Sequence, residues 1–438
     1  MVNQKQSWGI IGGGIMGMTL ALRLAERGYK VTILEASSKP GGLTGSINMN
    51  RIVWDRFYHV ILMSDLNTRK IIKEIGLEHD LKWVETKTGF FSDGTLYSMS
   101  NIFEYLRFPL IGLPGKFRLG LTIIAASLIR DWKRMEKIPV EKWLRRWSGN
   151  KVFEKIWLPL LKAKLGELYK ETSASFIWTT IQRMYAARRT GLKKEMFGYV
   201  SGGYDRIIPA FIERLISSGV TIITDYKVNK IYSENSGALT VEDNFSQKKQ
   251  FDAVISTIPS DVSVDIASGL DDEEVEKHKS IKYLGVICPS VFLRRPVSNY
   301  YVTNITDTWP PFTGIIEMTA LVNPEELGNM HLVYLPKYAE PDNELFNRHE
   351  TDLKDYFLRS LLRMYPFLSE PDIIHWSLSK AGRVFALPTL NYSVNLPSVF
   401  TSMYRYYIIN SAQIINGTLN VNETIRVAET KLEEILRE

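Results

Sequence analysis

Residues 8–35, WGIIGGGIMGMTLALRLAERGYKVTILE, decide the fold class of this chain. Residues 8–11 form a short apolar run that predicts a strand, and residues 30–34 predict a second strand. Between them, residues 15–27 have apolar side chains at the 3.6-residue period of a helix, and Gly28 follows as a helix-ending residue. A strand, a helix and a strand in this order predict a βαβ unit, and therefore an α/β fold with a mainly parallel sheet.

Three glycines between the first strand and the helix have the spacing GxGxxG. Gly12 allows a tight turn, Gly14 lets the backbone approach a pyrophosphate, and Gly17 lets the helix pack closely on the strand. The helix start directs free N–H groups at the phosphates. Glu35, at the end of the second strand, is placed to bind a ribose 2′-hydroxyl and to repel the 2′-phosphate of NADP. These features predict a Rossmann-like dinucleotide-binding domain; the alternative is a glycine turn without a nucleotide.

A second pair of glycines follows the acid. Residues 38–46 read SKPGGLTGS and include Gly41 and Gly42. Adjacent glycines give the backbone a second close approach beside the first phosphate site, which a plain NAD domain does not need. We therefore expect FAD rather than NAD, although the segment taken alone is also consistent with a flexible surface loop.

With these motifs, the chain resembles the superfamily of flavin-containing amine oxidases, protoporphyrinogen oxidases and phytoene desaturases, and more distantly UDP-galactopyranose mutase. The resemblance runs the length of the chain and rests on separate segments. They are GIIGGGIMGMTLALRLAERGYKVTILEASSKPGGLTGS (residues 9–46), GYVSGGYDRIIPAFIERLISSGVTIITDYKVNKIY (198–232), FDAVISTIPSD (251–261) and INGTLNVNETIRVAE (415–429).

The resemblance implies FAD as the cofactor and indicates where it is bound. In the family, the residue matching Val228 contacts the adenine end through its backbone, and the strand before Thr257 returns beneath the nucleotide. The C-terminal segment closes over the isoalloxazine. The residues expected to contact FAD are Gly12, Gly14, Ile15, Met16, Gly17, Glu35, Ala36, Gly41, Gly42, Leu43, Thr44, Val228, Thr257, Asn416, Leu419, Asn420 and Val421.

The sequence departs from the family pattern at two places. Many relatives carry Arg directly after the second glycine pair, where this chain has Leu43. The phosphate or flavin contact of that Arg is then missing or comes from elsewhere. A Gly-Asp pair ahead of the last helix is also absent, and Asn410-Ser411 stands near its place.

Asn420 and Glu423 have the spacing of a capping box and predict a terminal helix that runs to about Leu436. The resemblance implies that the start of this helix faces the pyrimidine edge of the flavin. There its dipole would stabilise negative charge on the reduced ring and raise its reduction potential. The alternative is an ordinary capped terminal helix.

We expect the FAD-binding domain to be discontinuous, made of residues 1–60, 196–265 and 380–438. Residues 61–195 predict a mostly helical insertion, with a hairpin turn signal at Asp93-Gly94 between short apolar runs in residues 84–98. Residues 266–379 contain short apolar runs separated by Pro and Gly, which predict a mixed-sheet substrate domain. The two insertions should build the substrate side of the molecule.

Part of the helical insertion has the pattern of a membrane-surface element. Residues 108–129 are apolar with basic flanks, and residues 130–146 mix Trp132 and Trp143 with Lys and Arg. Relatives that act on polyprenyl or porphyrin substrates often dock on membranes at such an insert. The alternative, which we favour at this point, is a helical subdomain that packs on itself.

Composition excludes several other classes of function. The net charge of +6 is small for 438 residues, and no basic stripe interleaved with aromatics indicates nucleic acid. One cysteine, Cys288, and six scattered histidines leave no disulfide framework and no metal-ligand spacing. We expect no signal peptide and no spanning helix, because the apolar run of residues 111–129 is interrupted by charges. We therefore expect a cytoplasmic location, which is compatible with peripheral contact to the cytoplasmic face of a membrane.

Flavin chemistry needs no side-chain nucleophile, so the candidate site residues are those that could orient a substrate or move a proton. The candidate catalytic residues are His59, which could bond flavin O4 or relay a proton, and Lys162 and Lys164, which could hold a phosphate or carboxylate. A satisfied structural histidine and a solvated helix face are the alternatives. Candidate substrate-binding residues are Arg183, with Arg188 and Arg189, and Tyr334 and Lys337, with Tyr338 and Glu317.

Three hypotheses follow. The leading one is an FAD-dependent oxidoreductase that performs two-electron oxidation or desaturation, or the reverse reduction, of a C–N or C–C bond in a small, hydrophobic or polyprenyl-type substrate. The alternative is a flavin-dependent sugar-nucleotide isomerase like UDP-galactopyranose mutase. The third is a flavoprotein scaffold without enzymatic activity. The sequence predicts neither the electron acceptor nor the oligomeric state.

Overall fold

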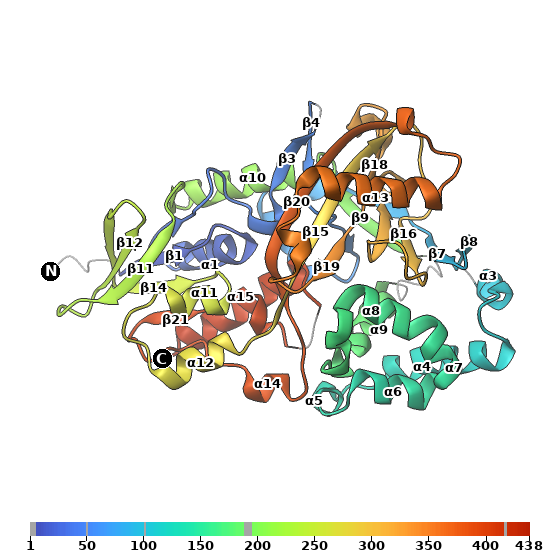
Figure 1. Ribbon diagram of the computed structural model, residues 1–438. Coiled ribbons are helices and arrows are strands. Elements are labelled where there is room, and N and C mark those ends of the chain that lie inside the picture. Colours follow the sequence, from blue (N-terminus) through green and yellow to red (C-terminus); the bar gives the residue numbers. More distant parts are fainter. Residues whose placement is uncertain (1–5, 50, 100–101, 188–194, 416–417) are drawn as a thin grey trace.

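The computed structural model describes residues 6–49, 51–99, 102–187, 195–415 and 418–438. Its main sheet has five parallel strands in the order β10-β2-β1-β14-β21. A second, mixed sheet of eight strands and a group of helices lie beside it (Figure 1). The predicted α/β fold class, with a parallel sheet, a mixed sheet and a helical insertion, is confirmed.

The parallel sheet begins with the predicted βαβ unit. Strand β1 (Ser7–Ile11) leads through the glycine turn into helix α1 (Ile15–Glu26), and β2 (Lys30–Leu34) pairs with β1 in parallel. Side chains alternate along the strands, so Ile10 packs on the α1 side while Ile11 packs on the opposite side of the sheet.

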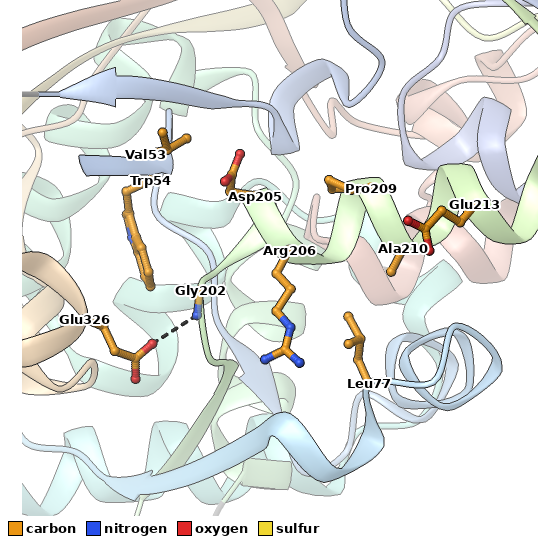
Figure 2. Close-up of a pocket in the computed structure, with 10 residues that line it drawn as sticks. All are labelled: Val53, Trp54, Leu77, Gly202, Asp205, Arg206, Pro209, Ala210, Glu213 and Glu326. Carbon is orange, nitrogen blue, oxygen red and sulfur yellow. Dashed lines mark hydrogen bonds between the residues drawn. The ribbon is translucent and has the colours of Figure 1, made fainter. Parts of the chain in front are cut away.

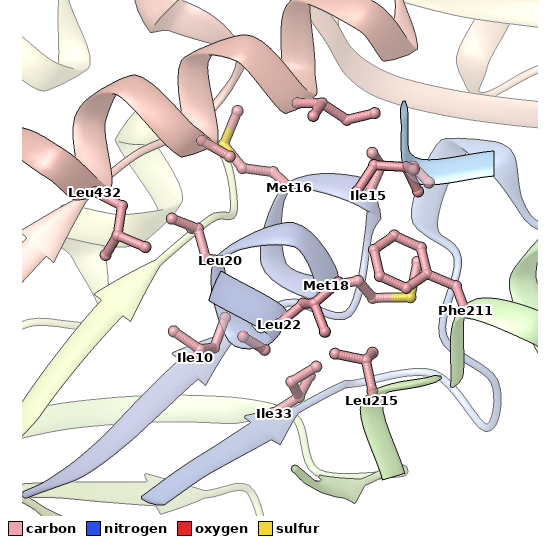
Figure 3. Packing of buried hydrophobic residues seen from close by; sticks show 14 of the residues in the cluster. Ile10, Ile15, Met16, Met18, Leu20, Leu22, Ile33, Phe211, Leu215 and Leu432 are labelled. Carbon is pink, nitrogen blue, oxygen red and sulfur yellow. The ribbon is translucent and has the colours of Figure 1, made fainter. Parts of the chain in front are cut away.

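The other three strands come from distant parts of the chain: β10 (Thr221–Ile223), β14 (Ala253–Ser256) and β21 (Tyr406–Ile408). Helices α10 (Tyr204–Ser217) and α15 (Val421–Ile435) pack beside α1 over one face of the sheet (Figure 3). A three-stranded antiparallel sheet covers the other face; its strands are β11 (Val228–Ser233), β12 (Leu239–Asp243) and β13 (Lys248–Phe251).

The mixed sheet is built around the long strand β15 (Tyr283–Leu293), which is buried along its whole length. Two of its strands, the hairpin β7 (Thr88–Ser92) and β8 (Thr95–Ser98), come from the first insertion, which therefore contributes strands as well as helices. The remaining strands are β16 (Val302–Ile305), β17 (Gly314–Glu317), β18 (His331–Tyr334), β19 (Lys337–Ala339) and β20 (Ile373–Ala386). Strand β20 runs across residue 380, but the expected domain boundaries themselves stay a prediction.

The helices of the first insertion form a lobe at the edge of the molecule (Figure 1). A second core cluster holds this lobe together and is separate from the cluster around α1. Its helices are α3 (Ile102–Arg107), α4 (Leu113–Leu128), α5 (Trp132–Glu136), α6 (Val140–Ser148), α7 (Asn150–Val152), α8 (Leu158–Leu165) and α9 (Ser175–Ala187).

Further strands and helices complete the fold. Strands β3 (Ser46–Met49) and β4 (Ile52–Asp55) form a hairpin after the second glycine pair. The others are β5 (Ile61–Leu62), α2 (Leu66–Glu74), β6 (Leu81–Glu85), β9 (Met196–Val200), α11 (Ser260–Asp265), α12 (Asp272–Lys279), α13 (Glu350–Met364) and α14 (Tyr392–Asn395). Within the described part of the chain, no helix has the length and apolar character that crossing a membrane requires.

Candidate cofactor and substrate site

The two glycine turns predicted from the sequence lie against each other. Gly14 and Gly41 form a parallel bridge, and the Gly41 N–H donates to the Gly13 carbonyl at 2.9 Å. A Cβ added at Gly42 would lie 3.2 Å from the Gly14 Cα. A Cβ added at Gly14 itself meets, among the described atoms, only the Gly42 Cα at 3.9 Å. Space is therefore left beside the Gly14 backbone, where a phosphate could approach.

Close backbone packing explains the other two glycines of the first turn. Gly12 has φ +99°, and a Cβ there would lie 2.6 Å from Thr257 Oγ1. A Cβ on Gly17 would lie 1.9 Å from the Gly12 carbonyl oxygen. Thr257 fastens the turn to β14, because its hydroxyl donates to the Ile11 carbonyl at 2.8 Å.

Glu35 is buried at the end of β2, beside the first glycine turn. Its carboxylate accepts the Gly13 N–H at 2.6 Å and the Ser37 N–H at 2.8 Å. Each carboxylate oxygen can accept more than one hydrogen bond, so these contacts orient Glu35 and leave lone pairs for ribose hydroxyls. Ala36 follows it directly and is exposed.

Helices α1 and α15 run parallel and in register. Arg23 bonds Glu429 at 2.7 Å, and Arg27 bonds Glu433; both pairs are 406 residues apart in sequence. The same spacing relates Ile15 to Val421, the first residues of the two helices. The opening βαβ unit and the closing helix therefore start at the same level, side by side.

Helix α2 starts at the same end. The Asn422 side-chain oxygen accepts the Asn67 N–H at 2.9 Å, which joins the start of α2 to the start of α15. At the other end, Arg23 also pairs with Glu74 of α2 at 2.9 Å. Three positive helix ends thus gather where the glycine turns lie, and the start of α1 has no side-chain cap. This arrangement favours an anionic group.

The terminal helix forms only half of the predicted capping box. The Asn420 side chain accepts the Glu423 N–H at 3.0 Å, as expected. The Glu423 carboxylate pairs with Arg426 at 2.7 Å instead of returning to the Asn420 backbone. Leu419 and Val421 pack against the cluster around α1, and Asn416 lies outside the described residues.

The structure also describes four other residues of the expected cofactor set. Ile15 and Met16 are buried in the first turn of α1, and Val228 is buried at the start of β11. The Thr44 hydroxyl donates to the Gly41 carbonyl at 2.8 Å, which braces the second turn. Leu43 packs against the cluster under the mixed sheet, so no cation stands directly after the glycine pair.

His59 lies in a buried setting between β4 and α10. Its ring packs on Tyr204, with the ring centroids 4.9 Å apart, and Nδ1 is 3.9 Å from the Asp55 carboxylate. Burial lowers the pKa of His59 to about 4, and it raises the pKa of the Asp55 carboxyl, which accepts the Tyr204 N–H, to about 8. His59 Nδ1 is buried without a hydrogen-bond partner among the described residues, so the imidazole is neutral and has a ring nitrogen free.

The structure places Arg183 near the helix starts. Its guanidinium pairs at 2.9 Å with the buried carboxylate of Asp65, the residue before α2. This pairing occupies part of the charge that was expected to hold a substrate. Arg188 and Arg189 lie outside the described residues.

Lys162 and Lys164 have different surroundings, although both lie on α8. Lys162 is exposed and pairs with Glu167 at 3.2 Å, a placement that gives no support to a catalytic role. Lys164 Nζ lies 3.8 Å from the centroid of the Tyr338 ring. The Tyr338 hydroxyl is 2.9 Å from that of Tyr58, the neighbour of His59. The helical lobe therefore reaches the mixed sheet and the His59 segment through Lys164.

The remaining sheet candidates are mostly structural in their contacts. Tyr334 is fully buried and its hydroxyl donates to the Asp55 carbonyl at 2.7 Å. Glu317 is fully buried and accepts the Val297 N–H at 2.9 Å; burial raises the pKa of its carboxyl to about 7. Burial lowers the pKa of Lys337. Lys337 neighbours Tyr338 on β19, so the two side chains point to opposite sides of the sheet.

Sequence reasoning missed three residues here: Asp55, Arg56 and Tyr58. Arg56 donates its N–H to the Gly45 carbonyl at 3.0 Å, and its side-chain Nε is buried without a partner among the described residues. All three belong to the segment WDRFYH, which was singled out only for its histidine. A dense run of polar and aromatic residues after a strand was the available signal.

A surface pocket of about 470 Å³ lies on the outer side of α10 (Figure 2). Two of its charged groups are already partnered: Arg206 pairs with Asp80 at 2.8 Å, and Glu326 accepts the Gly202 N–H at 3.0 Å. This pocket is therefore distinct in character from the helix-end site, where donors are open.

The twin glycine turns, Glu35 and the aligned helix starts fit a dinucleotide with a diphosphate, and together with the parallel sheet beneath them they define a dinucleotide-binding fold. Comparison with known families agrees: residues 15–380 match the family described as flavin containing amine oxidoreductase. The chain belongs to this family of FAD-dependent oxidoreductases, and FAD is its cofactor.

Individual relatives are distant. The chain is 26% identical to coproporphyrinogen III oxidase of Staphylococcus aureus (strain NCTC 8325 / PS 47) over 294 residues, which cover 59% of this chain and 61% of that one. The chain thus spans about three-fifths of the length of this curated relative. A provisional protoporphyrinogen oxidase from Exiguobacterium sp. 255-15 has the same fold, with TM-score 0.78, 17% identity and full coverage of both chains. Reduced UDP-galactopyranose mutase is also similar in fold, with TM-score 0.74 and 15% identity over 99% of this chain and 96% of that one.

Proposed function

We propose that this chain is an FAD-dependent oxidoreductase that carries out two-electron oxidation or desaturation, or the reverse reduction, of a C–N or C–C bond in a small organic substrate. The observation that carries the proposal is that helices α1 and α15 begin side by side, next to the twin glycine turns. FAD, when bound, supplies the hydride acceptor or donor. The family match and the coproporphyrinogen III oxidase relative support a redox reaction over a rearrangement.

The protein's own groups position the reactants. The α1 start and the Gly14 backbone bind the diphosphate, and Glu35 holds the ribose. His59 is neutral at pH 7, because its pKa is about 4, so it can accept a proton at one ring nitrogen and donate from the other. Lys164 lies at the junction of the helical lobe, the mixed sheet and the His59 segment, where a substrate could be oriented.

A sugar-nucleotide mutase is the weaker candidate. It would need cations for a diphosphate sugar, and Arg183 is already paired with Asp65. The redox state of the flavin during turnover and the binding of UDP distinguish the two activities. An oxidoreductase bleaches its oxidised flavin when it turns over substrate anaerobically, whereas a mutase binds UDP more tightly in its reduced form and leaves the redox state unchanged.

The first experiment is to purify the chain, add FAD, remove the excess and record the visible spectrum. We expect about one protein-bound flavin per chain. Photoreduction under nitrogen should bleach this flavin. Mixing the reduced protein with oxygen or a quinone should then restore the oxidised spectrum. A colourless protein would contradict the proposal, and a flavin that never changes redox state would favour a scaffold.

We also propose that the helical lobe contacts an anionic membrane surface, which gives access to a lipid-like substrate. Large apolar side chains on α3 and α4 are exposed, including Phe103 (73%), Leu113 (70%), Phe117 (70%) and Leu128 (72%). Residues 103–155 carry twelve lysines and arginines against five aspartates and glutamates, a larger positive surplus than the +6 of the whole chain. Exposed apolar groups with basic neighbours suit a bilayer with anionic headgroups.

Vesicle sedimentation tests this contact. The protein should bind vesicles that contain phosphatidylglycerol better than vesicles of phosphatidylcholine alone, and added salt should weaken binding. A variant with Leu113→Ser, Phe117→Ser and Leu128→Ser should bind at least about tenfold more weakly. The control replaces exposed apolar residues elsewhere, Phe245→Ser, Phe367→Ser and Val394→Ser, and should bind as the original protein does. Equal binding by both variants would contradict the contact.

A further inference from the structure

We propose that Lys164 and the hydroxyl pair of Tyr58 and Tyr338 form an anion-binding corner that holds a carboxylate or phosphate group of the substrate. The inference rests on the proposed function, because it names the chemical class of substrate for the same site. It concerns residues that are neither in the glycine turns nor at the helix starts.

The corner joins three segments that are far apart in sequence. Lys164 comes from α8 in the helical lobe, Tyr338 from β19 of the mixed sheet, and Tyr58 from the segment after β4. Lys164 Nζ lies 3.8 Å from the Tyr338 ring centroid and 5.9 Å from that of Phe385. The ammonium group is therefore held against two aromatic rings, in a cation–π contact.

Hydrogen-bond donors are left over at this point. The ammonium group of Lys164 has three donors, and within the described ranges no carboxylate lies at ion-pair distance from it. The two hydroxyls of Tyr58 and Tyr338 are 2.9 Å apart, so one proton is shared between them and the second is free. Burial raises the pKa of Tyr58 well above its usual range, so this phenol keeps its proton. Four donors with one positive charge suit an anionic oxygen group.

The neighbouring lysine shows that this arrangement is specific to one position. Lys162 lies two residues earlier on α8, is exposed, and is neutralised by Glu167 at 3.2 Å. Lys164 is half-buried against aromatic rings instead. A substrate with an anionic end would be anchored beside the hydroxyl of Tyr58, the residue before His59 in sequence, and its apolar body would remain in contact with the surrounding aromatic side chains.

Calorimetric titration of the FAD-loaded protein tests the corner, with hexanoate and hexyl phosphate as anionic probes and hexanol as the neutral one. The protein should bind at least one of the two anions and should bind hexanol about tenfold more weakly or not at all. Tighter binding of hexanoate assigns a carboxylate, and tighter binding of hexyl phosphate assigns a phosphate. Lys164→Met should weaken anion binding about tenfold, and Lys164→Arg should restore most of it. Tyr338→Phe should weaken it less, because one donor is lost without the charge.

Lys162→Met is the matched control and should bind the anions as the original protein does. The corner is wrong if neither anion binds, or if Lys164→Met and Lys162→Met bind them equally. The flavin spectrum of each preparation separates the two proposals. Bound FAD with no anion binding rejects the corner alone, whereas a protein that binds anions at Lys164 but takes up no FAD rejects the proposed function.

Discussion

Helices α1 and α4 are both apolar, but their surroundings are opposite. In α1, every residue from Ile15 to Leu24 is buried, because β1, α10 and α15 surround it (Figure 3). Helix α4 packs on α6 and α9 and leaves Leu113, Phe117 and Leu128 exposed. The apolar content of a helix therefore does not tell what covers it. On the flavin side, other elements of the chain cover the apolar helix. In the helical lobe, one apolar side of α4 is left uncovered by the described residues.

The largest expected effect sharpens this contrast with one glycine from each helix. Gly17→Ala would place a Cβ 1.9 Å from the Gly12 carbonyl oxygen, so the glycine turn must deform. We expect a loss of more than about 4 kcal/mol in unfolding free energy, with loss of FAD. Gly120→Ala on α4 has no atom within 4 Å of the new Cβ and should stabilise the chain by up to about 1 kcal/mol. Urea unfolding and FAD retention measure both, and similar results for the two variants would break the comparison.

Two leucines test burial directly. Leu20 of α1 is fully buried, so Leu20→Ala should cost about 3 kcal/mol through lost contacts and a cavity. Leu128 of α4 is 72% exposed, and Leu128→Ala should change stability by less than about 0.5 kcal/mol. Thermal unfolding without lipid checks both values. A large cost at Leu128 would mean that α4 is covered within the protein.

The flavin side also buries ionisable groups whose shifted pKa values make stability depend on pH. Burial raises the pKa of Asp55 to about 8 in the folded state, from about 4 in the unfolded chain. The folded state holds this proton more tightly, so stability falls as pH rises between these values. The lowered pKa of His59 acts in the opposite direction, but only below about pH 6.5. Above that pH, Asp55 and Glu317, whose pKa burial raises to about 7, act in the same direction, and Asp55 accounts for the larger part because its pKa is higher.

Between pH 6.5 and 8 we expect a loss of about 2 kcal/mol in the original protein without cofactor. Asp55→Asn should remove most of this loss. Asp131→Asn, at an exposed position in the lobe, should retain it. Urea unfolding at several pH values measures the slopes, and an unchanged slope in Asp55→Asn would show that another group titrates.

The smallest expected effect concerns a helix start. Asn422→Ala removes the acceptor for the Asn67 N–H at the start of α2 and should cost about 1 kcal/mol. On α4, the exposed Ser127 hydroxyl donates to the Ile124 carbonyl, and Ser127→Ala should have an effect below about 0.5 kcal/mol. Chemical unfolding resolves the difference. Equal values would mean that Asn422 does not couple α2 to α15.

The fold could be predicted where the chain's constraints are local. Residues 8–35 specify strand, turn and helix through glycines whose need is visible in sequence, and the structure has those elements. The expected strands of the mixed sheet also occur, and the Asp93-Gly94 turn signal lies at the turn of the β7–β8 hairpin. The pairing of β7 with β16 was not predicted, because it is set by tertiary contacts.

The site was harder to predict because its contacts are long-range. Lys162 and Lys164 look alike in sequence, yet side chains two residues apart on a helix point about 200° apart, and only the position of β19 decides which one is buried. The partner of Tyr58 is 280 residues away. Glu423 had the right spacing for a capping box, but Arg426 on the next turn competes for its carboxylate.

The three aligned helix starts have a consequence for the life of the protein in a cell. Asp65 and Glu423 lie at the starts of α2 and α15, whereas the first turn of α1 has no acidic residue of its own and no side-chain cap. Without FAD, the free amide groups of α1 therefore face the like dipoles of the other two helix starts. A ligand at 100 times its Kd adds about 2.7 kcal/mol to stability, a large share of a typical total. Chains made during flavin shortage should therefore be degraded sooner, and the amount of enzyme should follow the vitamin supply.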